Sequence, residues 1–462
     1  MTKFTLKKLP ETVMRKYDIR GVFGKDLTEE VAYSFARRFG GFLQNKKAKS
    51  VAVGYDARLS SPKLRSSLIK GLREQGINVV DIGLCPTPVL SFAHIELQTD
   101  AGIMITGSHN PPDHNGFKTT FKREPFFDQD IKSLNKLQPK RVSFSEEGTL
   151  KEKSVNSLYA KRVCRGVEKI PPYRIIWDCG HGAAGAILPQ VLKLLPGEHT
   201  VLYGQVDGTF PAHHPDPTVK ENLEDLQRVV LEKKADVGFA FDGDADRLGV
   251  VDNNGNIIWV DILLILLGQD ILKRHPGATI IGDIKSSDIL FNKIKEYGGC
   301  PYVAPTGHSI IKKCLKELSA LLAGEVSGHI FFIEDYYGFD DGIYSAIRTL
   351  GAMSALPGSL NDWYNSLPAT YTTPEIRVEY SKDKISLIED IYKKLKDEET
   401  LEIKTLDGLK VSFKDKGWWL LRASNTQDVL VVRCEGRSKK DLQEVVYHLN
   451  MMLQSHDISL KF

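Results

Sequence analysis

Three aspartates alternate with small residues in one short stretch of the chain, Asp242, Asp244 and Asp246. The apolar segment DVGFAF precedes them, so we expect them to follow a buried strand; a solvated acidic turn is the alternative. Carboxylates at alternate positions of an extended backbone point the same way, and they repel one another unless a cation neutralises them. Oxygen ligands of this kind suit Mg²⁺ or Ca²⁺, so the three aspartates are predicted metal ligands.

The spacing of these acids excludes an EF-hand. An EF-hand needs a glycine at its sixth position and a glutamate at its twelfth, where this chain has Arg247 and Asn253. Three protein ligands also leave coordination positions open. Open positions suit a Mg²⁺ ion that also contacts a phosphate oxygen.

A serine with restricted neighbours follows another apolar segment, in Thr106-Gly-Ser-His-Asn-Pro-Pro112. Glycine before Ser108 allows an unusual backbone angle and the prolines fix the exit, so the serine is held on a rigid turn. With His109 beside it and Lys118 ten residues on, Ser108 could be a nucleophile or a phosphate carrier; an ordinary Gly-Ser turn is the alternative. A hydrolase elbow is unsupported, because Asn110 stands where its last glycine would be.

Two more loops carry polar groups in suggestive patterns. Glu325 and Ser327, flanked by glycines, could hydrogen-bond adjacent hydroxyls of a sugar; a glycine-rich turn is the alternative. The stretch 422–426, Arg-Ala-Ser-Asn-Thr, gathers donors suited to phosphate, and a polar hairpin loop is the alternative. The remaining candidates for the same site, each unremarkable alone, are Tyr17, Arg20, Lys285 and His308.

The elements that must position these loops form three repeats. Apolar runs that end near Asp56, Asp178 and Asp283 are each followed by a polar turn and an amphipathic helix, then by a second strand and helix and a third strand. Each third strand ends in one of the loops just described. This alternation predicts largely parallel sheets covered by helices, with ligands beyond the carboxyl ends of the strands. If the units are homologous, their loops converge on one cleft; coincidence among α/β units is the alternative.

The tail of the chain has a different pattern. After a helix-rich stretch at 338–367 we expect a strand in 373–381, a charged helix over 384–399, three strands within 410–436 and a final helix over 442–453. This predicts a small α+β domain after three similar α/β domains with mixed, mostly parallel sheets. The predicted domains are 1–153 with the serine loop, 154–256 with the metal loop, 257–367 with the sugar loop, and 368–462 with the phosphate loop.

Composition excludes several classes of protein. The 462 residues carry a net charge of only +3, which gives no electrostatic footprint for nucleic acid or an anionic membrane. No two of the six cysteines are closer than 14 residues, so neither a Cys-x-x-Cys motif nor a disulfide scaffold is indicated. The most apolar segment, 262–267, is too short to span a bilayer, and the basic N-terminus lacks the apolar stretch of a secretory signal. We expect a cytoplasmic protein.

Five motifs in this order, KYDIRG, TGSHNP, DGDADR, GEVSGH and RASNT, resemble those of the α-D-phosphohexomutases, with bacterial phosphomannomutase/phosphoglucomutase as the most similar branch. The resemblance spans residues 17–436. It implies a heart-shaped enzyme of four domains around a central cleft. It also implies an isomerase that uses Mg²⁺ to interconvert hexose 1-phosphates and 6-phosphates.

The resemblance also implies roles for single residues. Ser108 matches the phosphoserine, whose oxygen completes the Mg²⁺ site, one ion per chain. Glu325 and Ser327 match the pair that grips the sugar O3 and O4. The residues that match the loop around the non-reacting phosphate are Arg422, Ser424, Asn425 and Thr426. Those that match the basic residues around the transferring group are Arg20, His109, Lys118, Arg247, Lys285 and His329. Which of them is the general acid and which the base stays open.

Substrate choice follows less directly. Val326 stands where the phosphomannomutase/phosphoglucomutase branch often has Met and the glucosamine branch Gln. We expect activity on both glucose and mannose phosphates, with glucose 1,6-bisphosphate as intermediate and activator. A phosphoglucosamine mutase, a sugar-phosphate phosphatase and a catalytically silent binding protein are the alternatives. We expect a monomer, with a dimer as the alternative.

Overall fold

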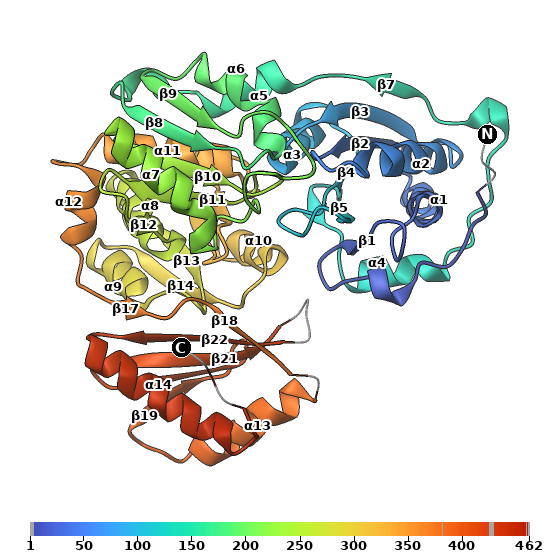
Figure 1. The fold of residues 1–462 in the computed structure, drawn as a ribbon. Coiled ribbons are helices and arrows are strands. Elements are labelled where there is room, and N and C mark those ends of the chain that lie inside the picture. The colour runs from blue at the N-terminus through green and yellow to red at the C-terminus, as the bar shows by residue number, and fades with distance from the viewer. Residues whose placement is uncertain (1–3, 381, 425–428, 459, 461–462) are drawn as a thin grey trace. The chain divides into compact units, whose positions relative to one another are not determined.

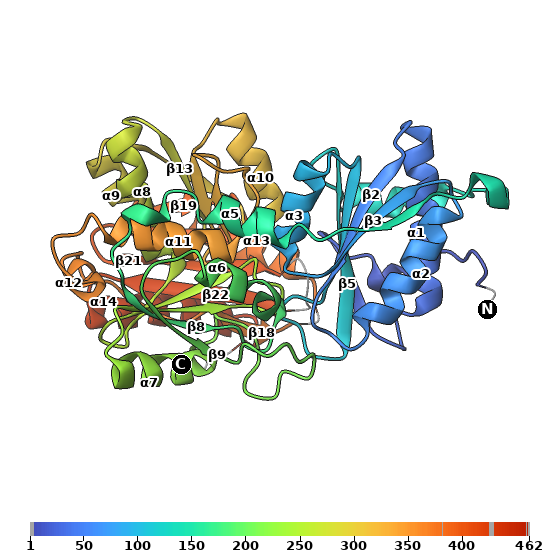
Figure 2. The ribbon, with the colours of Figure 1, turned by 90° about the horizontal axis from the view of Figure 1, so that it is seen from above.

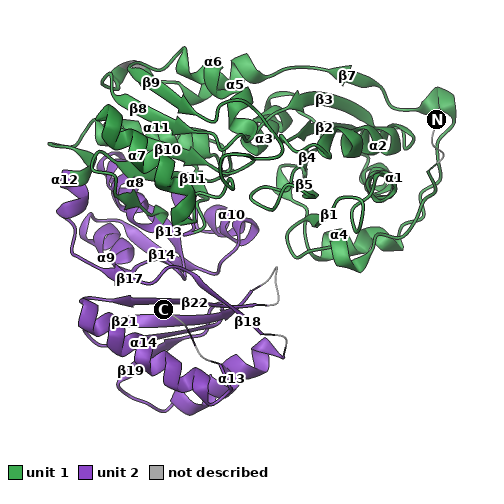
Figure 3. Cartoon of the chain, viewed as in Figure 1, with its two compact units in different colours: residues 1–260, 327–361 green, residues 261–326, 362–462 purple. Residues whose placement is uncertain are grey.

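The computed structural model describes residues 4–380, 382–424, 429–458 and 460 (Figure 1). The chain forms two compact units, which Figure 3 distinguishes by colour. Unit 1 comprises residues 1–260 and 327–361, and unit 2 comprises 261–326 and 362–462. Among the described residues, no helix combines the length and apolar content that crossing a membrane would need.

Unit 1 contains two sheets, of which the first is mixed. Its strands are β1 (Ile19–Val22), β2 (Ser50–Tyr55), β3 (Asn78–Leu84), β4 (Ala101–Ile105), β5 (His114–Phe121), β6 (Glu124–Pro125) and β7 (Leu150–Glu152). They run in the order β1-β5-β4-β2-β3-β7, with β6 paired to β5. The neighbours β4, β2, β3 and β7 are parallel, whereas β5 is antiparallel to both β1 and β4.

Helices cover both faces of this sheet. They are α1 (Glu29–Asn45), α2 (Ser61–Arg73), α3 (Thr87–Glu96) and α4 (Gln129–Ser133). In Figure 2, α1 and α2 lie together on one side of the strands and α3 lies on the other. The helix α1 begins after Thr28, whose side chain accepts a hydrogen bond from the Val31 amide. It buries Phe35 against Phe117 of β5, with ring centroids 5.2 Å apart.

The second sheet of unit 1 repeats this plan. Its strands are β8 (Arg174–Asp178), β9 (Glu198–Leu202), β10 (Val237–Phe241), β11 (Leu248–Asp252) and β12 (Ile257–Ile258), in the order β12-β11-β10-β8-β9. Here β8 is parallel to β9 and β10, and β11 is antiparallel to β10. The other elements of unit 1 are α5 (Asn156–Val163), α6 (Leu188–Leu192), α7 (Glu224–Lys233), β16 (Ile330–Phe332) and α11 (Gly342–Met353).

Unit 2 begins with a third run of strands and helices. Its elements are α8 (Val260–Arg274), β13 (Thr279–Asp283), α9 (Asp288–Glu296), β14 (Cys300–Ala304), α10 (His308–Glu317) and β15 (Leu322–Gly324). The strand β13 is parallel to both β14 and β15. The short helix α12 (Leu360–Asn365) contains the point at which the chain returns from unit 1 to unit 2.

The tail forms an antiparallel sheet with two helices. Its elements are β17 (Tyr371–Thr372), β18 (Ile376–Glu379), α13 (Lys384–Leu395), β19 (Leu401–Lys404), β20 (Leu409–Phe413), β21 (Gly417–Ala423), β22 (Val429–Gly436) and α14 (Lys439–Gln454). The sheet order is β17-β22-β21-β20-β19, with β18 paired to β22. Both helices pack on one face of it, where Ile391 and Leu449 join the buried core around Trp419 (Figure 1).

These sheets confirm the predicted fold class, three similar mixed α/β domains and an α+β tail. In each repeat the first strand (β2, β8, β13) lies between two parallel neighbours, which are the next two strands of the chain. The second repeat departs in one detail. Its first helix is replaced by a 3₁₀ turn, Ala183–Ala186, and the five-residue α6, because Pro189 and the small residues before it do not support a long helix. The boundaries proposed between the domains stay predictions.

Candidate active site

Ser108 lies in the loop after β4 of unit 1, with a backbone that few non-glycine residues adopt. Its φ is +50°, in the left-handed region, and the residue is 2% exposed. Its amide donates a 2.8 Å hydrogen bond to Thr106 Oγ1, and its hydroxyl donates to Asp242 Oδ2 at 2.7 Å. Nδ1 of His109 lies 3.1 Å from the same hydroxyl oxygen. The serine side chain is thus held against the loop that follows β10.

The three aspartates of that second loop are all buried and lie close together. Asp242, Asp244 and Asp246 each offer a carboxylate oxygen within 4.8 Å of the other two. Lys118 of β5 lies between them, with Nζ 2.7 Å from Asp244 Oδ2 and 2.5 Å from Asp246 Oδ2. The Asp244 side chain also accepts a hydrogen bond from the Thr87 hydroxyl, and the Asp244 carbonyl accepts one from the Thr87 amide. Lys118 of β5 and Thr87, the first residue of α3, therefore both hold the triad in place.

Burial and charge act in opposite directions on these groups. Burial, with the charges of Asp244 and Asp246, raises the pKa of Asp242 well above its usual range. Burial also opposes ionisation of Asp244, but the adjacent Lys118 ammonium outweighs it and lowers the pKa of that carboxyl. The same pairing raises the pKa of Lys118 although burial works against its charge. Asp244 and Asp246 thus share one ammonium group, and Arg247 Nε lies 3.9 Å from Asp242 Oδ2, so three acids face two cations.

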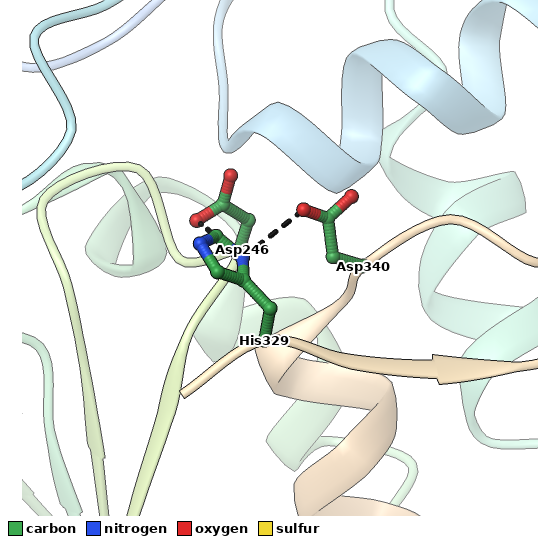
Figure 4. A group of neighbouring side chains, drawn as sticks. All are labelled: Asp246, His329 and Asp340. Atoms are coloured by element: carbon green, nitrogen blue, oxygen red, sulfur yellow. Dashed lines mark ion pairs between the residues drawn. The ribbon is translucent and has the colours of Figure 1, made fainter. Parts of the chain in front are cut away.

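His329 connects the triad to two further residues of unit 1. Its Nδ1 lies 3.0 Å from Asp340 Oδ2 and 3.5 Å from Asp246 Oδ1, so the ring sits between two carboxylates (Figure 4). Its Nε2 accepts a 3.2 Å hydrogen bond from Arg247 Nε, and the backbones of residues 247 and 329 form an antiparallel bridge. Arg247 is also held by Asp216, whose Oδ1 lies 3.8 Å from NH1. These contacts fix the orientation of the imidazole.

Basic residues surround His109. Burial, followed by the charges of Arg247, Arg20 and Lys118, lowers the pKa of His109 well below its usual range, so this imidazole is neutral at neutral pH. Arg20 of β1 reaches the serine loop, where NH1 donates to Asn110 Oδ1 at 3.1 Å. We refer to the residues around the triad as the acidic cluster: Ser108, Lys118, Asp242, Asp244, Asp246, Arg247 and His329.

The acidic cluster fits a hard divalent cation. It offers three buried carboxylates and a serine oxygen, and the acids exceed the cations that contact them. Asp242, with its raised pKa, has the most to gain from an added positive charge. The three predicted ligands are therefore brought together as the sequence analysis expected.

Unit 2 contains a second group of charged residues, in which each buried cation is paired with a carboxylate. Glu325, at the end of β15, is 2% exposed and accepts a 2.7 Å hydrogen bond from the amide of Gly307, just before His308 begins α10. Arg422 of β21 is 5% exposed and pairs with Asp407, whose Oδ2 lies 3.2 Å from both Nε and NH2.

The carboxylate of Asp407 links these two parts of unit 2. The same Oδ2 that pairs with Arg422 accepts a 3.0 Å hydrogen bond from the amide of Thr306. The turn at 305–307 is therefore tied to the tail sheet on one side and to Glu325 on the other. The predicted sugar and phosphate residues of this unit are thereby connected through one turn.

Lys285 is the other buried cation of unit 2. It follows β13, is 4% exposed, and places Nζ 3.0 Å from Glu375 Oε2 and 3.8 Å from Asp283 Oδ2. Its charge lowers the pKa of Glu375 to about 2. We refer to these residues of unit 2 as the basic cluster: Lys285, His308, Glu325, Glu375, Asp407 and Arg422.

Four family models match nearly the whole chain. They describe α/β/α domains I, II and III and the C-terminal domain of phosphoglucomutase/phosphomannomutase, and they match residues 11–135, 153–255, 259–371 and 375–449. This chain belongs to the phosphoglucomutase/phosphomannomutase family.

Individual relatives agree with this assignment. The phosphomannomutase/phosphoglucomutase of Pseudomonas syringae pv. tomato is 43% identical over 457 residues, which cover 98% of each chain. That of Pseudomonas aeruginosa is 44% identical over 453 residues, covering 98% of this chain and 97% of its own. A crystal structure of a family protein from Burkholderia thailandensis superposes with a TM-score of 0.90 at 36% identity, covering 98% of this chain and 99% of that one. The resemblance stated from five motifs is confirmed, and with it the expectation of a mutase, an isomerase.

The structure brings the predicted site residues of this phosphohexomutase into two groups. Those within or beside the acidic cluster are Arg20, Ser108, His109, Lys118, Asp242, Asp244, Asp246, Arg247 and His329. Those of unit 2 are Lys285, His308, Glu325, Arg422 and Ser424. Tyr17 and Ser327 belong to unit 1 and are half-buried. Asn425 and Thr426 lie outside the described residues.

Sequence reasoning missed the carboxylates and hydroxyls that hold these residues. Thr87, Asp340, Glu375 and Asp407 contact predicted site residues but belong to none of the five motifs. Of these residues, only Asp340 has a local signal in the sequence. It stands next to Asp341, which caps α11 by accepting a hydrogen bond from the Tyr344 amide.

Proposed function

We propose that this chain interconverts the 1-phosphates and 6-phosphates of both glucose and mannose through a phosphoryl group carried on Ser108. One observation supports this most strongly. A buried serine in a left-handed conformation directs its hydroxyl into a cluster of three carboxylates and one ammonium group. A serine so placed is suited to exchange a phosphoryl group rather than to serve as an ordinary turn residue.

In the first transfer, the bond between phosphorus and Ser108 Oγ breaks while a sugar hydroxyl oxygen bonds to the phosphorus. The product is a hexose 1,6-bisphosphate, glucose 1,6-bisphosphate for the glucose substrates. Ser108 Oγ gains the proton that the sugar hydroxyl loses, so the step balances, and Asp242 Oδ2 accepts a hydrogen bond from the serine hydroxyl that results. His329 lies beside the transferring group in this proposal, with its ring held by Asp340 at Nδ1 and by Arg247 at Nε2. The second transfer reverses these changes with the other phosphate of the bisphosphate.

The charge on the transferring group is the main difficulty of this reaction. Phosphoryl transfer spreads negative charge over three equatorial oxygens, so catalysis depends on fixed positive groups and little on covalent chemistry. Mg²⁺ held by the three aspartates and a phosphoserine oxygen would neutralise part of this charge. Lys118 and Arg247, both fixed by carboxylates, supply the remainder.

A further set of residues, most of them in unit 2, is assigned to substrate recognition. Arg422, Ser424, Asn425 and Thr426 hold the non-reacting phosphate in this proposal, and Lys285 is one of the basic residues around the transferring group. Glu325 and Ser327 hold the sugar O3 and O4. Gripping O3 and O4 suits a bisphosphate that must turn over between the two transfers, because a two-fold rotation exchanges these hydroxyls. Tyr17 and His308 complete the binding site.

The test is intact-mass measurement and phosphosite mapping before and after incubation with glucose 1,6-bisphosphate and Mg²⁺. We expect one phosphate on Ser108 and none in the Ser108→Ala variant, which should retain the melting temperature of the wild type and lose mutase activity. A coupled assay for glucose 6-phosphate, run from glucose 1-phosphate, gives the activity. The absence of phosphate on Ser108 in all conditions would reject the proposal.

The alternatives differ in what they release. A sugar-phosphate phosphatase would produce inorganic phosphate at the rate at which substrate disappears, and a phosphoglucosamine mutase would prefer glucosamine phosphates to glucose and mannose phosphates. Parallel assays for phosphate and for the isomerised sugars separate all three. We also propose that the enzyme is a cytoplasmic monomer with the domain limits given above; sedimentation analysis tests the monomer.

A further inference from the structure

Arg58 is a fully buried arginine of unit 1 that belongs to none of the five sequence motifs. It lies in the turn between β2 and α2, and its side chain is 0% exposed. Burying a guanidinium is costly unless its donors are satisfied. The hydrogen-bond acceptors around Arg58 therefore indicate which segment this residue holds in place.

The guanidinium of Arg58 binds the main chain of the segment 108–114, which contains the serine loop. Its acceptors are the carbonyl oxygens of Ser108 (2.8 Å from NH2), Asn110 (2.5 Å from NH2), His114 (2.8 Å from NH1) and Pro111, and Oδ2 of Asp56 (3.1 Å from Nε). Four carbonyl groups that point to one side chain fix the course of seven consecutive residues.

Gly107 of the same loop packs directly against the guanidinium of Arg58. A Cβ atom on Gly107 would lie 2.5 Å from Cζ and Nε of Arg58, so only a glycine admits the guanidinium this close. The Gly107 amide donates to Asp56 Oδ2, the carboxylate that also binds Arg58 Nε. Arg58 thus shares one anchor with the residue that precedes Ser108.

The carbonyl of Ser108 also faces the metal loop. A Cβ atom on Gly243 would lie 2.5 Å from Ser108 O, so this oxygen sits between the guanidinium and the backbone of the aspartate triad. Ser108 has a φ of +50°, which costs free energy and persists only when the surroundings impose it. The contact from Arg58 is the charged contact that opposes relaxation of this angle.

We propose that Arg58 is a positioning residue for phosphoryl transfer, which holds the backbone of Ser108 so that its hydroxyl faces the aspartate triad. This inference rests on the proposed function of Ser108. Arg58 does not touch the hydroxyl or the aspartates of the triad through any hydrogen bond in the described structure, so it acts through the loop. A planar guanidinium serves this purpose where an ammonium group does not, because its five donors form a fixed fork.

The experiment compares two buried arginines that both bind main-chain carbonyls. In Arg58→Lys the charge remains and the fork is lost. The matched control is Arg38→Lys: Arg38 of α1 is 1% exposed and donates to the carbonyl oxygens of Lys7, Leu134, Asn135 and Leu137, away from the serine loop. Both variants should lose similar amounts of thermal stability, so stability alone cannot produce a difference between them.

The readout is the rate of Ser108 phosphorylation by glucose 1,6-bisphosphate with Mg²⁺, followed by intact mass. Because a misplacement of 1 Å can cost roughly 10²-fold in rate, we expect a loss of about 10- to 100-fold in Arg58→Lys and of less than about threefold in Arg38→Lys. In steady-state assays kcat should fall while KM for glucose 1-phosphate stays within about twofold, since unit 2 is unchanged. Mn²⁺ affinity, measured by calorimetry, should also stay within about twofold because the triad is intact.

Three results would overturn the inference. If Arg58→Lys is phosphorylated at the wild-type rate, the inference is wrong and the proposed function is unaffected. If Arg58→Lys and Arg38→Lys lose the same factor in phosphorylation rate, Arg58 acts only through stability. A wild-type protein that takes up no phosphate rejects both the function and the inference.

Gly107→Ala tests the same contact from the other side, even if Arg58→Lys does not fold. Its methyl group would displace the guanidinium, so the phosphorylation rate should fall although Arg58 is present. Since Lys leaves room for that methyl group, the double variant should lose less than the product of the two single losses. A wild-type rate in Gly107→Ala, or independent losses in the double variant, would contradict the proposal.

Discussion

The acidic cluster of unit 1 and the basic cluster of unit 2 both bury charge, but they balance it differently. In the acidic cluster three carboxylates lie within 4.8 Å of one another, two of them share the ammonium group of Lys118, and Arg247 Nε lies 3.9 Å from the third, Asp242. In the basic cluster each buried cation lies within 3.2 Å of one carboxylate, Glu375 for Lys285 and Asp407 for Arg422, and Lys285 also has Asp283 Oδ2 at 3.8 Å.

This difference indicates how each cluster responds to a ligand. A cluster of crowded acids gains free energy from an added cation, so it favours the binding of a metal ion. A cluster in which every buried cation is already paired gains less from an incoming phosphate, because each cation has an anionic partner with which the phosphate must compete. Changes to the acidic cluster should therefore alter kcat and metal affinity, and changes to the basic cluster should alter KM.

The largest effect is expected for Asp244→Asn. This change removes one carboxylate of the triad, which is one of the two carboxylate partners of Lys118 and lies 2.7 Å from its Nζ. Loss of a preorganised charge at a transfer site costs about 10²- to 10³-fold, so kcat should fall by roughly that factor while KM changes little. Mn²⁺ affinity, measured by calorimetry, should fall in parallel.

Asp252→Asn is the matched control for this variant. Asp252 ends β11 in the same sheet and is 0% exposed, but its carboxylate accepts from the amides of Asn254 and Asn256, outside the cluster. It should lose stability and keep its metal affinity. An Asp244→Asn variant that binds Mn²⁺ as the wild type does would remove the contrast between the clusters.

A smaller effect, on KM, is expected for Arg422→Met. A charged hydrogen bond to a ligand is worth about 1.5–3 kcal/mol, so KM for glucose 1-phosphate should rise roughly 10- to 100-fold with kcat nearly unchanged. Steady-state kinetics measure both constants. The control is Arg437→Met, an exposed arginine of the same sheet domain that pairs with Asp415. If kcat falls and KM does not change, the division of roles between the clusters is wrong.

The two clusters were also predictable to different extents. The metal loop follows an uninterrupted apolar strand, and the serine loop is marked by glycine and two prolines, so their positions at strand ends could be inferred from local pattern. The parallel order around β2, β8 and β13 followed from the alternation of strands and helices. These features depend on neighbours in the sequence.

The partners that balance the charges were not predictable, because they meet the site only after folding. Asp407 lies in a turn with no motif, 15 residues before Arg422, and Glu375 lies 90 residues after Lys285. The tail shows a similar limit. The charged helix predicted to reach Glu399 ends at Leu395, its last buried residue, since the exposed residues that follow have no apolar face to pack, and β19 then begins at Leu401.

Competition between carboxylate and phosphate can be tested with Asp407→Asn. Asparagine keeps an acceptor for the Thr306 amide and removes the charge that pairs with Arg422. Because the phosphate no longer has to displace an anion, KM for glucose 1-phosphate should fall by about two- to fivefold, which corresponds to less than about 1 kcal/mol. A rise in KM would show instead that Asp407 orients Arg422 for binding.

The smallest effect concerns the pH dependence of stability in the basic cluster. Lys285 lowers the pKa of Glu375 to about 2 in the folded protein, against 4.5 in the unfolded chain. A depressed acid pKa contributes stability that is complete above the unfolded value and is lost as pH falls toward the folded value. In Glu375→Gln this contribution is absent, so the variant should be less stable than the wild type at pH 7. The difference should shrink by roughly 1 kcal/mol between pH 7 and pH 4.

Urea unfolding of both proteins at these two pH values measures that change. Glu402→Gln is the control, because Glu402 pairs with Lys404 at the surface, where an ion pair contributes about 0–1 kcal/mol and its loss should depend little on pH. A difference between Glu375→Gln and the wild type that is the same at pH 7 and pH 4 would mean that the glutamate acts through packing. The carboxylates of the basic cluster would then not be the charge partners that set it apart from the acidic cluster.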